Sequence, residues 1–307
     1  MKSGTNLEKV LGSGHFVLTG ELGPPRGTSV DAVRQKASYL KDNVDAVNIT
    51  DNQTGMVRMS SWATSMILLQ EGIEPVYQMV CRDRNRLAMQ SDILGASGLG
   101  IGNMLCLSGD HQQFGDHPHA KGVFDIDSLQ LISMVKSMRD ESKFQGGADI
   151  ESPPSMFIGA AANPFAEPYE WRVYRLAKKI EAGVDFIQTQ CVFNMKRMRE
   201  WLKQAEDMGL TERTSILAGV TPMKSVGMAK FMQSKVPGMD VPDEIIDRLR
   251  GVPKKSQKDE GIRIAVEQIQ EFKEMKAVAG VHLMAIEWEH RVPEIAEAAQ
   301  MLPRPQV

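Results

Sequence analysis

Short apolar runs alternate with longer amphipathic segments along the whole chain. The apolar runs are rich in Val, Ile, Leu and Met, which is typical of buried strands, and the amphipathic segments have the three-to-four-residue spacing of helices. The pattern predicts strands at HFVLTGE, DAVNIT, EPVYQMV, NMLCLSG, MFIGAA, VDFIQTQ, TSILAGV and GVHLMAIE. It predicts helices near 28–42, 60–71, 84–96, 127–142, 167–182, 194–208, 224–235, 257–279 and 292–301.

This order of elements indicates the fold class. A strand followed by a helix, repeated about eight times, implies a parallel sheet with crossover helices, and eight such units close into a barrel. We therefore expect a single (β/α)8 TIM barrel domain over residues 1–307. A doubly wound open sheet is the alternative, but no hydrophilic linker divides the sequence into two halves.

Polar residues stand where three of the apolar runs stop. Glu21 follows HFVLTG, Asp110 follows MLCLSG, and Gln190 follows VDFIQT. In a parallel barrel the carboxyl ends of all strands converge on one mouth, where active sites lie. The placement therefore predicts that these three side chains share a pocket.

The loops after the first, second and fourth strands add polar groups to the same face. Burial of the Glu21 carboxyl group would favour its protonated form, which suits a general acid, and an exposed loop acid is the alternative interpretation. The segment NITDNQTG is dense in hydrogen-bonding groups, of which helix capping explains only one or two. The segment GDHQQFGDHPHAKGVFD is expected at the mouth, and FQGGADIESPPS at the opposite face.

Composition and charge exclude some functions. The 307 residues carry a net charge of -3 with basic and acidic residues interspersed, so nucleic acid is not an expected partner. No apolar stretch reaches the length of a membrane span, and the N-terminus lacks a signal-peptide core, so we expect a cytoplasmic protein without membrane insertion. The three cysteines lie in apolar runs and are expected to be buried reduced thiols: Cys81, Cys106 and Cys191.

Two further motifs are interpreted conservatively. The glycines of GASGLGIGN precede a strand, whereas a dinucleotide-binding loop follows one and opens a helix, so a helix end and turn is the simpler interpretation. Three histidines crowd the loop after the fourth strand, but they lack the spacing of a zinc site, and we expect no metal. They are His111, His117 and His119.

The motifs GELGPPRG, NITDNQTG, LCLSGDHQ and AGVDFIQTQCVF, in this order, resemble those of the methylenetetrahydrofolate reductase family. The resemblance runs from about residue 16 to about residue 235. It implies a (β/α)8 barrel that holds a flavin, usually FAD with FMN as the alternative. It also implies hydride transfer from the flavin to 5,10-methylenetetrahydrofolate, which yields 5-methyltetrahydrofolate in one-carbon metabolism and methionine biosynthesis.

The resemblance implies roles for individual residues. Glu21 matches the catalytic glutamate that protonates folate so that its imidazolidine ring opens. Asp110 matches the catalytic aspartate that faces flavin and pterin, and Gln190 matches the amide that orients folate. The implied cofactor-binding residues are Thr50, Gln78, Ser108, Gly109, Asp110, Asn163 and Lys179.

Departures from the family pattern affect the cofactor, the substrate and the electron donor. Gln78 stands where many relatives have His, and Ser108 where many have Arg. The last strand and its loop differ as well, and Trp288 is expected to stack on the substrate, beside Glu287 and His290. Val226 stands where NAD(P)H-using relatives carry a phenylalanine. The electron donor is therefore expected to be NAD(P)H or a partner electron-transfer subunit or ferredoxin, and the chain to form an oligomer or a hetero-complex.

Two other functions remain open at this point. The chain could be a flavin- or folate-binding subunit of an electron-transfer complex that is inactive alone. It could also be a metal-dependent TIM-barrel lyase or hydrolase that uses Glu21, Asp110 and the loop histidines.

Overall fold

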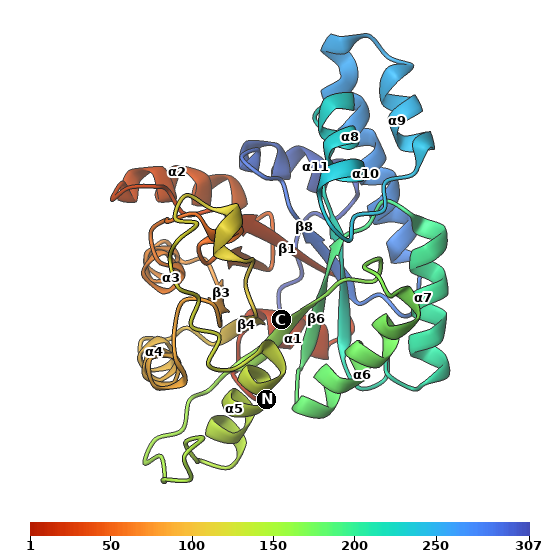
Figure 1. The fold of residues 1–307 in the computed structure, drawn as a ribbon. Coiled ribbons are helices and arrows are strands. Elements are labelled where there is room, and N and C mark those ends of the chain that lie inside the picture. Colours follow the sequence, from red (N-terminus) through yellow and green to blue (C-terminus); the bar gives the residue numbers. More distant parts are fainter.

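A computed structural model describes all residues, 1–307, and shows a closed barrel of eight parallel strands ringed by helices (Figure 1). Neighbouring strands pair in sequence order, and β8 pairs with β1, which closes the sheet. The predicted (β/α)8 barrel is confirmed and the open-sheet alternative is wrong. The strands are β1 (Val17–Leu22), β2 (Ala46–Ile49), β3 (Pro75–Val80), β4 (Asn103–Leu107), β5 (Phe157–Ala162), β6 (Phe186–Cys191), β7 (Ser215–Val220) and β8 (Gly280–Leu283).

The helices cover the outside of the barrel, and all nine that the sequence pattern predicts are present. Two short helices, α1 and α9, were not predicted. The α-helices are α1 (Asn6–Gly12), α2 (Val30–Leu40), α3 (Ser61–Gln70), α4 (Arg86–Gly98), α5 (Ser128–Asp140), α6 (Arg172–Ala182), α7 (Met195–Asp207), α8 (Val226–Lys235), α9 (Asp243–Arg250), α10 (Gln257–Lys273) and α11 (Val292–Ala298). Short 3-10 helices are η1 (Gln53–Gly55), η2 (Gln112–Phe114), η3 (Tyr169–Trp171), η4 (Lys254–Ser256) and η5 (Glu289–Arg291).

The interior of the barrel changes from apolar to polar along its axis. At the amino ends of the strands, apolar side chains pack with Leu7 and Val10 of α1, and Phe157 stacks on Phe186 with ring centroids 5.2 Å apart. Two residues further along each strand, on the same inward face, the side chains are mostly polar. This upper layer includes Thr19, Asn48, Gln78, Gln188 and His282, all of them buried.

Connections at the two ends of the barrel differ as the sequence suggests. The loop that holds η2 lies beside η1 at the strand carboxyl ends, whereas the long connection after α5 extends from the other end (Figure 1). Helices α8 and α9 project beyond the barrel and pack on a small separate core that includes Phe193, Met223 and Ile264. None of the helices is long and apolar enough to cross a membrane.

Candidate active site

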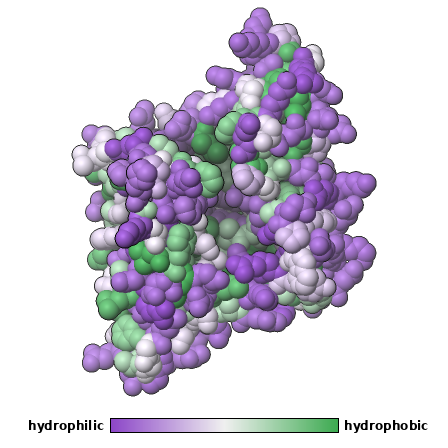
Figure 2. Space-filling model, viewed as in Figure 1, coloured by the Kyte–Doolittle hydropathy of each residue, from purple (hydrophilic) through white to green (hydrophobic).

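A cavity of about 340 Å³ opens at the carboxyl ends of β1 to β4 and β6. The space-filling view shows a hollow near the centre of the molecule, bordered by both hydrophilic and hydrophobic residues (Figure 2). Of the 14 residues that line the cavity only two are hydrophobic, Val80 and Leu107. The predicted site residues that line it are Glu21, Thr50, Gln78, Ser108, Gly109, Asp110 and Gln190.

Glu21 faces a buried histidine. Its side chain is 16% exposed, and Oε2 lies 3.5 Å from Nε2 of His282 on β8. The other ring nitrogen, Nδ1, is 2.9 Å from Oγ1 of Thr19. Thr19 therefore fixes the imidazole ring through Nδ1, and Nε2 faces the carboxyl group of Glu21. His282 and Thr19 were not among the residues predicted from the sequence. The alternation of side chains along a strand could have indicated them, because it points both side chains into the barrel at the same level.

Asp110 is held at the rim by two neighbouring loops. Thr54 N–H donates to Asp110 Oδ2 at 3.0 Å, and Arg82 Nη1 donates to the Asp110 carbonyl oxygen at 2.9 Å. The preceding Gly109 has φ of +89°, a conformation that an L side chain rarely adopts. The carboxylate therefore stands at the cavity edge with a fixed backbone beneath it.

The buried layer below the cavity has spare hydrogen-bonding capacity. Gln78 Nε2 donates to Asn48 Oδ1 at 3.3 Å, and Gln188 Nε2 to Thr19 Oγ1 at 3.5 Å. Asn48 Nδ2 and Gln188 Oε1 are buried and have no protein partner. Buried polar atoms of this kind normally find one, so a polar ligand or ordered water fits above this layer. Thr50 Oγ1, nearer the rim, donates to Gln53 Oε1.

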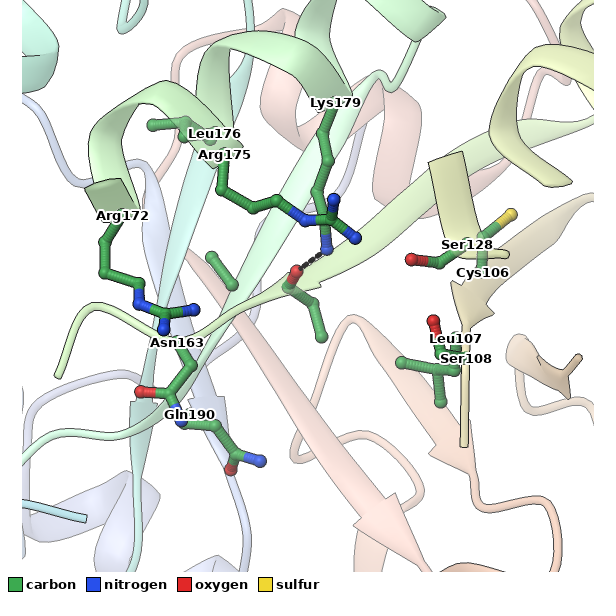
Figure 3. Close-up of a pocket in the computed structure, with 12 residues that line it drawn as sticks. Cys106, Leu107, Ser108, Ser128, Asn163, Arg172, Arg175, Leu176, Lys179 and Gln190 are labelled. Atoms are coloured by element: carbon green, nitrogen blue, oxygen red, sulfur yellow. Dashed lines mark hydrogen bonds between the residues drawn. The ribbon is translucent and has the colours of Figure 1, made fainter. Parts of the chain in front are cut away.

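A second cavity of about 230 Å³ adjoins the first and is positively charged on one side (Figure 3). Arg172, Arg175 and Lys179 extend from α6 toward it, because residues spaced three and four apart share a helix face. Burial, followed by the charge of Arg175, lowers the pKa of Lys179 from its ordinary value of 10.5 to about 8. Lys179 Nζ also donates to the Ala161 carbonyl oxygen. Two guanidinium groups and an ammonium group in one cavity fit a phosphate group.

The wall opposite α6 is uncharged and includes Ser108 and Ser128 (Figure 3). Asn163 lies beside Arg172, and its Oδ1 accepts from the N–H groups of Phe165 and Ala166 at 3.1 and 3.2 Å. Asn163 and Lys179 were among the residues predicted from the sequence, and the two arginines were not. Both cavities are lined by Leu107, Ser108 and Gln190, so a ligand that fills one contacts the walls of the other.

Trp288 is the predicted site residue that lines neither cavity. The indole is only 6% exposed, and Lys224, Lys258 and Arg291 place cationic groups 5.4 to 6.0 Å from its ring centroid. Packing and these cations occupy the faces that stacking on a substrate would require.

The neighbouring residues of the last loop have other surroundings. Glu287 has φ of 48°, and the His290 ring packs edge-on against Tyr39. Val226 begins α8 and packs against the small core there. It lines neither cavity.

The remaining candidate groups form no metal centre. His111 and His117 are exposed and bonded locally, the latter to Asp116 at 2.9 Å, and no group of three or more His, Cys, Asp or Glu residues is arranged to hold a metal ion. The prediction of buried free thiols is confirmed. Burial raises the pKa of Cys191 to about 11 and that of Cys81 to about 12, so neither is a ready nucleophile.

A family model and curated relatives that match this chain carry the same family name. A family model described as methylenetetrahydrofolate reductase matches residues 6–300. A probable methylenetetrahydrofolate reductase (NADPH) of Caenorhabditis elegans is 22% identical over 252 residues, which cover 79% of this chain and 34% of that protein. Methylenetetrahydrofolate reductase 2 of Saccharomyces cerevisiae is 23% identical over 270 residues, covering 84% and 42%. The chain thus spans less than half the length of these relatives.

Among solved structures, an uncharacterized protein from Clostridium thermocellum superposes with a TM-score of 0.64 at 13% identity, covering 97% of this chain and 99% of that one. That protein is described as binding two copies of 5-methyl-5,6,7,8-tetrahydrofolic acid. At this identity the likeness shows a shared barrel fold.

Proposed function

The chain belongs to the methylenetetrahydrofolate reductase family, and we propose that it reduces 5,10-methylenetetrahydrofolate to 5-methyltetrahydrofolate with a bound flavin. The observation that carries the proposal is that Glu21, Asp110 and Gln190, from three separate strand ends, line one cavity that adjoins a cationic one. An acid, an anionic group and an orienting amide beside a phosphate-binding surface are the groups that this reaction needs.

The residues present fit a flavin nucleotide. Arg172, Arg175 and Lys179 would hold its phosphate, whether the cofactor is FAD or FMN. Asn163 beside Arg172 and Ser108 on the opposite wall would supply polar contacts. Thr50, Gln78 and Gly109 lie where they would meet the ring. When bound, the flavin supplies the hydride that is delivered to the methylene carbon of the folate.

The chain's own residues then prepare the substrate. Gln190, which lines both cavities, would orient the folate between them. Glu21 would donate a proton to the amine nitrogen that leaves the methylene carbon, so that the imidazolidine ring opens to an electrophilic iminium. His282, fixed by Thr19, holds the Glu21 carboxyl group in place. The Asp110 carboxylate at the rim would accept a hydrogen bond from the pterin.

Substitution of Glu21 by glutamine tests this assignment. Gln keeps the shape and one hydrogen-bond acceptor but supplies no proton, so reduction of methylenetetrahydrofolate by the pre-reduced flavoprotein should slow by roughly 10²-fold or more. Flavin binding and reduction by dithionite should persist. Glu71→Gln, at a surface ion pair with Arg34, is the matched control and should change neither. A wild-type rate in Glu21→Gln would remove Glu21 from the acid role.

The electron donor is tested separately. The Caenorhabditis elegans relative carries NADPH in its name, which makes NADPH one candidate for this chain. Val226 offers no aromatic face for nicotinamide and lies outside both cavities, which supports a partner electron-transfer protein instead. Stopped-flow mixing of the flavin-loaded chain with NADH and with NADPH separates the two. Flavin bleaching within one turnover time by either nucleotide would exclude an obligatory partner.

A further inference from the structure

Arg82 lines the mouth cavity and has no part in the mechanism proposed above. It follows β3, and although it is a charged residue, it is only 3% exposed. Its guanidinium group bonds to three neighbours. Nη1 donates to the Asp110 carbonyl oxygen at 2.9 Å, Nη2 donates to the Asn52 carbonyl oxygen at 3.1 Å, and Nε and Nη2 each donate to the Asp83 carboxylate at 2.7 Å.

These bonds join the loops that carry the active-site groups. Asn52 belongs to the loop after β2 and has φ of 43°, which is a left-handed conformation that its neighbours must hold in place. Asp110 belongs to the loop after β4. The same two loops are joined a second time, because Thr54 N–H donates to Asp110 Oδ2 at 3.0 Å. Arg82 thus fixes the backbone of Asp110, and Thr54 fixes its carboxylate.

The surroundings of Arg82 also balance its charge. Hydrogen bonds from Arg82 and Asn52 outweigh the effect of burial and keep the pKa of Asp83 below its ordinary value, so the pair stays ionic. The backbone of Arg82 is fixed as well, since its N–H donates to the Ser108 carbonyl oxygen at 3.1 Å. Lysine could not replace this geometry, because an ammonium group lacks the planar fork that meets two carbonyls and a carboxylate together.

We propose that Arg82 is a positioning residue of the active site, which sets the place of the Asp110 carboxylate by tying its backbone to that of Asn52. The inference rests on the proposed function for its effect on the reaction. It does not depend on that function for its effect on the loops.

The first test is a double-mutant cycle on the folate half-reaction. The flavin-loaded protein is photoreduced and mixed with 5,10-methylenetetrahydrofolate, and flavin reoxidation is followed in a single turnover. Arg82→Gln and Arg82→Lys should each slow this step by about 10- to 100-fold, because a displacement of the order of 1 Å has that effect on a catalytic group. In an Asp110→Asn background the further loss from Arg82→Gln should shrink to less than about threefold, since linked residues are not additive.

The matched control is Arg86→Gln. Arg86 makes a comparable two-bond pair with Asp125, at 2.7 and 2.9 Å, and lies outside both cavities. This variant should reoxidise at the wild-type rate. The proposal would be overturned if Arg82→Gln slowed flavin reoxidation by the same factor in the wild-type and the Asp110→Asn backgrounds. Wild-type rates in both Arg82 variants would overturn it as well.

The second test needs no substrate. Hydrogen exchange measured by mass spectrometry on the ligand-free protein should show faster exchange at the Thr54 amide in Arg82→Lys and Arg82→Gln, and unchanged exchange there in Arg86→Gln. Unaltered protection of Thr54 in both Arg82 variants would overturn the proposal. If wild-type protein shows no folate-dependent reoxidation, the proposed function fails, and the exchange result still decides the role of Arg82.

Discussion

The pH dependence of cofactor binding should report on Lys179. Its pKa is about 8 in the ligand-free protein, and a bound phosphate would raise that value, because an anion stabilises the ammonium form. Binding then takes up a proton above pH 8, so affinity for a phosphorylated flavin must fall as pH rises. The charged fraction drops from about nine-tenths at pH 7 to about one-tenth at pH 9. Affinity should therefore weaken roughly tenfold, or about 1.4 kcal/mol.

Fluorescence titration of the apoprotein with FMN, FAD and riboflavin provides the assay. A phosphate monoester has its second pKa near 6, so the ligand charge is nearly constant above pH 7, and riboflavin lacks the phosphate altogether. The tenfold change should appear for the two nucleotides and be absent for riboflavin. It should also be absent in Lys179→Met, which should bind nucleotides roughly 10- to 100-fold more weakly at pH 7. An equal fall of affinity with rising pH in Lys179→Met, or for riboflavin, would refute this account.

Two further predictions concern stability and the rim. Arg304→Met leaves the buried Asp45 carboxylate without its ionic partner, although the hydrogen bond from Leu18 N–H remains. The free energy of unfolding should therefore fall by about 3–5 kcal/mol and the melting temperature by roughly 6–10 °C in calorimetry. Gly109→Ala places a Cβ 3.0 Å from Val80 Cβ at φ of +89°, so the folate half-reaction should slow roughly tenfold or more, as single-turnover reoxidation would show. Gly95→Ala, in open space on α4, is the control and should keep the wild-type rate.

The barrel could be predicted because its strands are buried on both faces and therefore appear as continuous apolar runs. Glu21, Asp110 and Gln190 could be predicted for the related reason that a polar residue ends each run. The two helices that were not predicted are short and do not follow the strand–helix alternation. Helix α1 precedes the first strand, and α9 lies between two other helices, α8 and α10. Helix α1 covers the barrel floor, and α9 packs on the small core with α8 and α10.

The cationic surface of α6 was not predicted, although the sequence contains a pattern that indicates it. Arg172 and Arg175 precede Lys179 on one face of a predicted helix, and the i, i+3, i+7 spacing is visible in the sequence. The direction of Trp288 is a different case. It follows Glu287, which has φ of 48°. Two of the three cations near its ring, Lys224 and Lys258, are distant in sequence, so no local pattern indicates which way the ring points.

The distribution of charge across the mouth restricts how ligands can lie in it. Arg172, Arg175 and Lys179 are all on the α6 side, whereas Glu21 and Asp110 line the cavity on the β1 to β4 side. An elongated ligand with an anionic end is attracted to α6 by that end, which leaves its uncharged part near Leu107 and Ser108, where the cavities meet. A second ligand bound at the same time would then lie on the acidic side and contact the first near Leu107 and Ser108. Direct transfer of a group between two ligands requires such contact, and Glu21 and Asp110 would lie beside the second ligand.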